Sequence, residues 1–189
     1  HMLEGYLAFA RGEGTEKPAP TDLGDLLEDV VGQIRRRGRP IDLHLEDRLH
    51  LPLRPNAFKR CVTNLVENAL KYGVEDAGGP EGGPGATRLE LEARAEGGTV
   101  VLCVRDHGPG IPDADKDRAT RRFVRLEESR NAPGSGLGLS LVQAVARLHD
   151  GRLALRDAEP GLRAELRLPV AGRGRSVAGD DPAVVRAPG

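Results

Sequence analysis

The segment Asn64-Leu-Val-Glu-Asn68-Ala-Leu-Lys71-Tyr72 decides the fold of this chain, because its polar and apolar residues recur with the period of a helix. On a wheel of 100° per residue, Asn68 lies about 40° to one side of Asn64 and Lys71 about 20° to the other. The opposite face predicts a core contact and carries Phe58, Val62, Leu65, Val66, Ala69 and Leu70. Two carboxamides and an ammonium on one face suit oxygen-rich anions and a hard cation. Taken alone, the two amides are also compatible with an ordinary solvent-facing surface.

A second segment, Asp106-His-Gly108-Pro-Gly110, follows the apolar run 99–105, which predicts a strand inside a sheet. At the end of such a strand, Asp106 is a fixed acceptor for an exocyclic amine such as that of adenine. Gly108 and Gly110 let a flat ring approach the backbone. A plain tight turn is the alternative, since Asp, Gly and Pro are common turn residues.

A third segment, Gly134-Ser135-Gly136-Leu137-Gly138-Leu139, precedes an amphipathic helix predicted to end near His149. Backbone N–H groups of glycines and the positive end of a helix form a phosphate cradle. The dinucleotide fingerprint does not match, because Leu139 occupies the position of its third glycine. The phosphate loop that ends in Gly-Lys-Ser/Thr is absent from the sequence. A flexible loop before a helix is the alternative here.

Together and in this order, the three segments resemble the N, G1 and G2 boxes of the catalytic ATP-binding domain of bacterial sensor histidine kinases, EnvZ-like members in particular. That family belongs to the superfamily of gyrase, Hsp90, histidine kinases and MutL. The resemblance covers residues 20–170 and implies ATP and Mg²⁺ as cofactors. The expected fold is an α/β two-layer sandwich, in which helices cover one face of a mixed sheet.

The resemblance also implies roles for single residues. Asn68 would bind Mg²⁺, Asn64 and Lys71 would approach the phosphates, and Tyr72 would flank the nucleotide. Asp106 would read adenine. The expected nucleotide-binding set is Asn64, Asn68, Lys71, Tyr72, Asp106, Gly108, Gly110, Gly134, Ser135, Gly136, Leu137, Gly138 and Leu139.

The segment Arg121-Arg-Phe123-Val-Arg125 resembles a reduced F box, with Thr120 in place of the first Phe. It lies in a polar stretch, 111–133, that is expected to act as a mobile lid. Arg125 or Arg122 would move with this lid and neutralise the transferred charge. The catalytic set implied by the resemblance is therefore Asn64, Lys71 and Arg125.

Asn64 separates a kinase from an ATPase. ATP-hydrolysing members of the superfamily carry a Glu general base one turn before the Mg²⁺-binding Asn, and an amide cannot take a proton from water. Glu67 is a second candidate base, although a solvated or ion-paired role fits it better. We therefore expect transfer of the γ-phosphoryl group to a histidine in a dimerisation domain outside this chain. A regulatory nucleotide-binding module without transfer, and an ATPase, are the alternatives.

Net charge and cysteine positions limit what else can be expected, and the resemblance implies partners and a location. The net charge of −1 gives no reason to expect binding to nucleic acid or membranes. Cys61 and Cys103 are predicted to be buried, reduced thiols. The expected partners are the protein's own dimerisation and phosphoacceptor domain, in a homodimer, and a response regulator. The expected location is cytoplasmic, with the full-length protein anchored in the inner membrane of a bacterium.

The chain divides into four predicted parts: a cloning remnant with the end of a dimerisation helix (1–14), a linker (15–20), the catalytic domain (21–170) and a disordered tail (171–189). Within the domain, Thr21 or Asp22 is predicted to cap a helix that runs to about Arg36. Pro55 is predicted to open the long helix that ends at Lys71. The predicted strands are 41–45, 49–53, 88–95, 99–105, 153–155 and 162–168.

Overall fold

The computed structural model describes residues 16–73, 89–121, 124 and 136–170. The predicted dimerisation-helix end and the C-terminal tail lie outside the described residues. So do Arg122, Arg125, Gly134 and Ser135.

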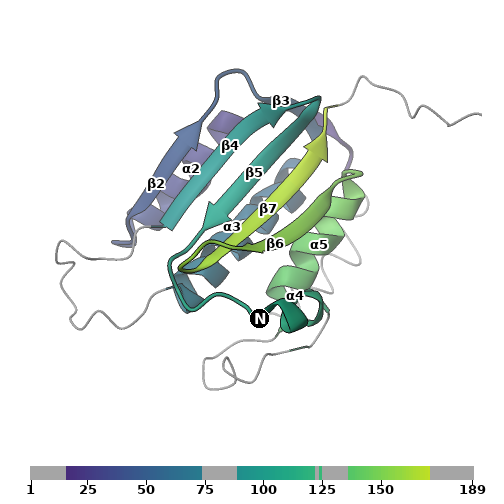
Figure 1. Ribbon diagram of the computed structural model, residues 1–189. Helices are drawn as coiled ribbons and strands as arrows, with labels where there is room; N and C mark the ends of the chain where they lie inside the picture. Colours follow the sequence, from purple (N-terminus) through teal and green to yellow (C-terminus); the bar gives the residue numbers. More distant parts are fainter. Residues whose placement is uncertain (1–15, 74–88, 122–123, 125–135, 171–189) are drawn as a thin grey trace, which may run out of the picture.

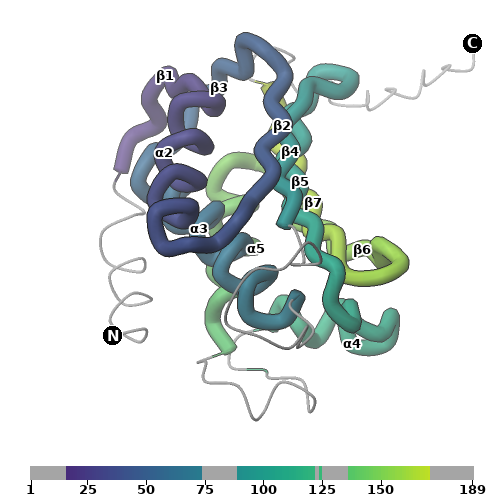
Figure 2. Tube along the Cα trace, turned by 90° about the vertical axis from the view of Figure 1, so that its left-hand side faces the viewer, coloured from purple at the N-terminus to yellow at the C-terminus, as the bar shows by residue number. Residues whose placement is uncertain are grey.

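Five strands form a mixed sheet in the order β2-β4-β5-β7-β6, and three long helices cover one of its faces (Figure 1). Only β2 and β4 run parallel; the other neighbours are antiparallel. Figure 2 shows α2, α3 and α5 on one side of the sheet. The predicted α/β two-layer sandwich is therefore confirmed. The elements are β1 (Ala19–Asp22), α2 (Leu23–Arg35), β2 (Ile41–Leu45), β3 (His50–Leu53), α3 (Pro55–Tyr72), β4 (Leu89–Glu96), β5 (Thr99–Arg105), α4 (Asp113–Ala119), α5 (Gly138–Leu148), β6 (Arg152–Asp157) and β7 (Leu162–Pro169).

Helix α3 is the centre of the helical layer, and its apolar face is buried as its sequence predicts. Phe58, Val62 and Val66 are fully buried, and Leu70 packs at the edge of the same core. Cys61 adds to this face as a free, buried thiol. None of the helices among the described residues is long and apolar enough to cross a membrane.

Two elements were not predicted. β1 falls partly within the predicted linker and pairs with β3, where Ala19 opposes Leu53. Its sequence, Ala-Pro-Thr-Asp, has no alternation that would reveal a strand. The other is α4, in the predicted lid, whose residues are all at least partly exposed. At the end of β1, the Asp22 carboxylate accepts hydrogen bonds from the N–H groups of Gly24 and Asp25, so Asp22 caps α2 as predicted.

The first turn of α3 is capped by Glu16, which lies some 40 positions earlier in the chain. Its carboxylate accepts hydrogen bonds from the N–H groups of Asn56 (3.0 Å) and Ala57 (3.1 Å). Arg54, the residue before α3, donates from Nε to the Glu16 carbonyl oxygen and from its backbone N–H to Nε2 of His149. Glu16 thus supplies acceptors to a helix start that Arg54 does not cap with its own side chain.

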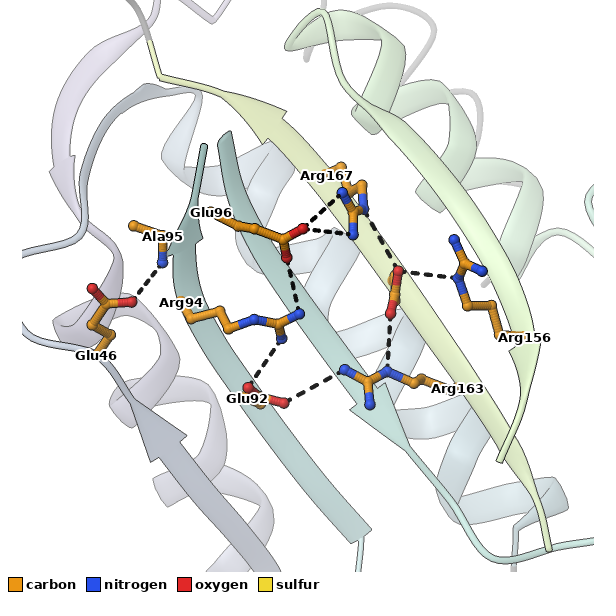
Figure 3. Close-up of polar contacts among 9 residues, drawn as sticks. Glu46, Glu92, Arg94, Ala95, Glu96, Arg156, Arg163 and Arg167 are labelled. Carbon is orange, nitrogen blue, oxygen red and sulfur yellow. Dashed lines mark hydrogen bonds and ion pairs between the residues drawn. The ribbon is translucent and has the colours of Figure 1, made fainter. Parts of the chain in front are cut away.

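The face of the sheet away from the helices is covered by charged side chains (Figure 3). Val101 and Cys103 point to this face and are nevertheless 0% and 3% exposed. Cys103 lies in register between Glu92 and Glu165 of the two neighbouring strands. Burial raises the pKa of the Cys103 thiol to about 11, and Cys103 is the free, buried thiol that the sequence predicts.

Glu165 is the centre of this charged layer. Its buried carboxylate lies 3.0 Å from Nε of Arg163 and 3.3 Å from Nε of Arg156, and Arg167 lies 3.6 Å away. Further ion pairs join Arg94 to Glu92 and Glu96. The Glu165 carboxylate therefore pairs with arginines from both β6 and β7 on the face of the sheet away from the helices.

Glu165→Ala should lower the free energy of unfolding by about 1–3 kcal/mol, because it removes the buried acceptor of several charge-assisted hydrogen bonds. The matched control is Glu96→Ala on the same face, where the glutamate side chain is 46% exposed. Its ion pairs are screened by water, so a loss below about 1 kcal/mol is expected. Urea titration of both variants measures the difference, and equal losses would contradict a central role for Glu165.

The same residue predicts a pH dependence. Burial alone would raise the pKa of Glu165, but the charges of Arg156, Arg163 and Arg167 outweigh it and hold the pKa below its ordinary value. The carboxylate therefore stabilises the fold fully above the unfolded pKa of about 4.3, and this contribution is lost as the pH falls through the folded pKa. The melting-temperature gap to Glu165→Gln should be widest at neutral pH and should close in acid. A gap that stays constant down to about pH 3 would contradict this.

Candidate functional site

The second half of α3 lies between the turn after β5 and the start of α5, so the three predicted segments come together. Gly138, the first residue of α5, lies against the Asn68 side chain; a Cβ at Gly138 would be 2.9 Å from Nδ2 and 3.1 Å from Oδ1 of Asn68. Gly73, at the end of α3, lies against Asp106 in the same way, with 2.3 Å from a built Cβ to the Asp106 Cβ. The described parts of the three segments therefore lie against one another in the fold.

Asn68 has an unusual environment for an amide. Its Nδ2 is buried and has no hydrogen-bond partner among the described residues. An unpaired buried amide costs free energy unless a ligand or water engages it. The side chain therefore has hydrogen-bonding capacity left for a bound group.

The other polar residues of α3 are differently engaged. Asn64 is half-buried, and its Nδ2 donates to the carbonyl oxygen of Arg60 one turn earlier at 2.8 Å. Lys71 donates from Nζ to the Tyr72 hydroxyl at 2.8 Å, and its Nζ lies 4.6 Å from the centre of the Tyr72 ring. The lysine charge is thus held beside an exposed aromatic ring at the end of the helix.

Asp106 is buried directly after β5, as its position in the sequence predicts, and is 7% exposed. One oxygen, Oδ1, accepts hydrogen bonds from the N–H groups of Gly108 (3.0 Å) and Leu162 (3.1 Å). Burial raises the pKa of Asp106, while these two N–H groups favour the charged form and oppose that rise. Both of these donors bind Oδ1, so the second oxygen, Oδ2, is the candidate acceptor for a ligand.

Close backbone contacts explain two of the glycines. A Cβ at Gly108 would lie 2.3 Å from the carbonyl oxygen of Tyr72 and 2.7 Å from the Cα of Gly73. Any side chain there would push the turn away from α3. Gly110 has a φ of +75°, which also favours glycine.

Sequence reasoning missed Gly73, Gly161 and Leu162. A glycine after the last helical residue is an ordinary helix stop, which signals a chain reversal but not contact with a site. The pair Pro160-Gly161 before the last strand likewise signals a turn. Neither pattern reveals that the turn touches Asp106, some 56 positions earlier in the chain.

The described start of α5 has backbone features that are compatible with a phosphate cradle, which stays a prediction. Gly136 has a φ of +70°, Leu137 is buried, and the helix has no side-chain cap from the described residues. The first N–H groups of a helix have no partner within it, so those of Gly138 and Leu139 are available to an anion. Ser140 is not a competitor, since its hydroxyl donates to the Leu137 carbonyl oxygen.

The described part of the predicted lid contains α4, which is held by an ion pair. Lys116 lies 2.9 Å from Asp157 at the end of β6 and 2.5 Å from Asp113 in its own helix. Hydrogen bonds to these two carboxylates raise the pKa of Lys116. A short helix without a buried side chain depends on such contacts for its position.

Lys116→Ala should therefore speed amide hydrogen exchange across α4 severalfold in the absence of nucleotide, because its link to β6 is lost. The control is Lys59→Ala, which removes an ion pair to Asp29 between α3 and α2. MgATP should slow exchange in α4 of the unmutated chain. Strong protection of α4 without nucleotide, or equal effects of the two variants, would contradict this prediction.

The residues present fit a nucleotide with a divalent cation. The Asn68 side chain carries an amide oxygen and a buried, unpaired Nδ2, and it faces the uncapped start of α5. Amide and phosphate oxygens are ligands that Mg²⁺ accepts. Asp106, which contacts Gly73 at the end of α3, has one carboxylate oxygen, Oδ1, engaged by N–H groups of the described residues, and its Oδ2 is the candidate acceptor for a ligand.

A family model described as "Histidine kinase-, DNA gyrase B-, and HSP90-like ATPase" matches residues 54–172. The signal transduction histidine-protein kinase/phosphatase MprB of Mycolicibacterium paratuberculosis is 35% identical over 145 residues, which are 75% of this chain and 26% of that protein. The alginate biosynthesis sensor protein KinB of Pseudomonas aeruginosa is 36% identical over 168 residues, 85% of this chain and 26% of that protein. This chain thus spans about a quarter of the length of these two relatives.

Solved structures show the same likeness. The ATP-binding domain of PrrB from Mycobacterium tuberculosis aligns with a TM-score of 0.62 and 27% identity, over 83% of this chain and 100% of that chain. The histidine kinase domain of the E. coli osmosensor EnvZ aligns with a TM-score of 0.60 and 29% identity, over 93% and 96%.

Proposed function

We infer the function of this chain from its family: it belongs to the histidine kinase-, DNA gyrase B- and HSP90-like ATPases. Its named relatives are sensor histidine kinases, and the chain is similar to their ATP-binding part. We therefore propose that it is the ATP-binding catalytic domain of a two-component sensor histidine kinase. Its reaction is transfer of the γ-phosphoryl of MgATP to a histidine in a dimerisation domain outside these 189 residues.

One observation carries this proposal: a single half-helix of α3 connects both ends of a nucleotide site. Asn68 meets the start of α5, the proposed phosphate site, and Gly73 meets Asp106, the proposed acceptor for a base amine. The two contact points are five residues apart, or about 7.5 Å along a helix. This spacing suits a compact ligand with a base at one end and phosphates at the other.

Each residue has a proposed role. Asn68 holds Mg²⁺, and the N–H groups of Gly138 and Leu139 hold phosphate oxygens. Lys71 contributes positive charge, and Tyr72 flanks the nucleotide. Bound Mg²⁺ supplies charge neutralisation at the phosphates. Arg125, which lies outside the described residues, is proposed to bring a further positive charge.

The site favours transfer to a protein acceptor over hydrolysis. Asn64 occupies the position of the ATPase general base, and its Nδ2 donates to its own helix. An amide has no proton-accepting role towards water, and Glu67, one turn later, is an exposed residue of α3. Thus the γ-phosphoryl remains for a nucleophile that arrives from another domain.

Calorimetry and radiolabelled ATP test the proposal on this chain. It should bind MgATP and MgADP, release phosphate slowly, and label a dimerisation hairpin of a related kinase supplied in trans. Brisk phosphate release by the chain alone, or stable label on His44, His50, His107 or His149, would contradict transfer to an external histidine. Absence of MgATP binding would overturn the proposal as a whole.

A binding module without phosphotransfer is the second candidate. Thr120 stands where the family has the first F-box Phe, and its hydroxyl donates to the carbonyl oxygen of Asp117 at an exposed helix end. At position 120 the predicted lid therefore has a polar hydrogen bond in place of the apolar contact that a Phe would make. Binding of MgATP without any labelling of the hairpin would favour this candidate.

The remaining proposals concern the whole protein. By similarity to two-component sensors, its partners are its own dimerisation and phosphoacceptor domain in a homodimer, and a response regulator. The domain is proposed to act in the cytoplasm of a bacterium, with the full-length protein anchored in the inner membrane. A pull-down of the full-length protein with candidate response regulators tests the second partner.

A further inference from the structure

We propose that the turn Gly161–Leu162, between β6 and β7, is a positioning element for nucleotide recognition, because it fixes the Asp106 carboxylate in one orientation. This inference rests on the proposed function, in which Asp106 accepts from the base. Gly161 and Leu162 themselves touch Asp106, not the nucleotide, and act through it.

Gly161 permits the closest of these contacts. A Cβ built on Gly161 would lie 1.9 Å from the carbonyl oxygen of Asp106 and 2.8 Å from the Cα of His107. Both atoms belong to the backbone of the turn after β5, which cannot rotate aside as a side chain could. Any residue other than glycine must therefore displace the Asp106–His107 peptide.

Leu162 holds Asp106 twice. Its carbonyl oxygen accepts from the Asp106 backbone N–H at 3.0 Å, and its own N–H donates to Oδ1 of the Asp106 carboxylate at 3.1 Å. The N–H of Gly108 donates to the same oxygen at 3.0 Å. Because Oδ1 is occupied by two donors, Oδ2 is the oxygen left for an exocyclic amine. The turn therefore decides which carboxylate oxygen faces a ligand.

Two further glycines close the space around this contact. A Cβ on Gly110 would lie 3.0 Å from the carbonyl oxygen of Gly161, and a Cβ on Gly73 would lie 2.3 Å from the Asp106 Cβ. Asp106 is thus enclosed between the end of α3 and the β6–β7 turn. If a side chain at Gly161 pushed Asp106 away, the close contact with Gly73 on the opposite side would leave little room for that movement.

A plain turn glycine is the alternative, since Gly161 has a φ of +103°. Gly97 and Gly38 separate the two explanations. Both have positive φ values, +58° and +76°, and a Cβ at either would meet nothing within 4 Å. Gly97→Ala and Gly38→Ala therefore carry backbone strain without a clash against Asp106.

The experiment compares Gly161→Ala with these two controls in the present chain, using MgATP and magnesium tripolyphosphate as ligands. Tripolyphosphate binds through phosphate contacts alone, so it does not depend on Asp106. Gly161→Ala should weaken MgATP binding at least about tenfold and leave tripolyphosphate binding within about twofold. Both controls should keep both affinities, whatever they lose in melting temperature.

An equal loss of affinity for the two ligands in Gly161→Ala would show general damage and overturn the positioning role, as would an unchanged affinity for MgATP.

If Gly161→Ala does not fold, amide hydrogen exchange in the unmutated chain tests the inference instead. MgATP should then slow exchange of the Leu162 and Gly108 N–H groups, and tripolyphosphate should not; equal protection by both ligands would overturn the inference. If the unmutated chain binds tripolyphosphate but not MgATP, the base-reading role of Asp106 fails and the positioning role with it. Binding of neither ligand is instead a failure of the proposed function.

Discussion

Asp106→Asn should weaken MgATP binding by about 10- to 100-fold while the fold remains intact. Two N–H groups, from Gly108 and Leu162, converge on Oδ1, so an asparagine must turn its amide oxygen towards them. Its NH₂ group then faces the amine of adenine, donor against donor, where the aspartate presents an acceptor. A buried polar group left in this state costs about 1–3 kcal/mol, and each 1.4 kcal/mol is tenfold in affinity.

Titration calorimetry with MgATP and MgGTP measures this effect. The control is Asp47→Asn, at an exposed position in the turn between β2 and β3, which should leave both affinities unchanged. The unmutated chain should prefer ATP, because guanine presents an oxygen where adenine presents its amine. Equal binding of ATP and GTP by the unmutated chain would refute the assignment of Asp106 as the residue that reads adenine.

Asn68→Ala should reduce phosphoryl transfer to a dimerisation hairpin by at least about 100-fold. The substitution removes the amide beside Gly138 and leaves the methyl group of alanine in its place. Positioning and charge neutralisation by a metal contribute several kcal/mol to such a transfer, and 1.36 kcal/mol is tenfold in rate. The fold should tolerate the change, because the amide Nδ2 makes no hydrogen bond within the described chain.

Radiolabelled ATP and a hairpin in trans give the rate, and a melting curve shows that the variant is folded. Gln33→Ala is the matched control, since it removes an exposed helical amide that bonds Asp29 on α2. Transfer by Asn68→Ala at the rate of the control would exclude Asn68 as the residue that holds the metal. The stability of the variant should equal or exceed that of the unmutated chain, which no purely structural role of Asn68 predicts.

Helix α3 and strand β5 show what local sequence can predict. The apolar face of α3 repeats with a period near 3.6, so the sequence pattern alone identifies its buried residues. Strand β5 reads Val-Val-Leu-Cys-Val without alternation, which predicts a strand covered on both faces. Asp106 comes directly after this strand, so the sequence also predicts a fixed position for its side chain at the end of a central strand.

The contacts that complete the site could not be predicted in this way. The fit of Gly73 and Gly161 against Asp106 depends on three chain segments that meet only in the folded state. The cover over Val101 and Cys103 likewise comes from charged residues of neighbouring strands, which look like ordinary solvent-facing positions in the sequence. Helix α4 was missed because ion pairs, rather than an apolar face, hold it. Pairings between distant segments leave no periodic signal.

The cap that Glu16 places on α3 ties the chain at residue 16 to the start of the helix that carries Asn68. Drawing Glu16 away would expose the N–H groups of Asn56 and Ala57, at a cost of about 1 kcal/mol for a lost helix cap. Linkage is reciprocal, so any ligand whose affinity depends on this cap would strengthen the hold on Glu16 by the same coupling free energy. If nucleotide binding at the proposed site depends on an ordered α3, a pull on the chain at Glu16 and nucleotide binding would shift one shared equilibrium.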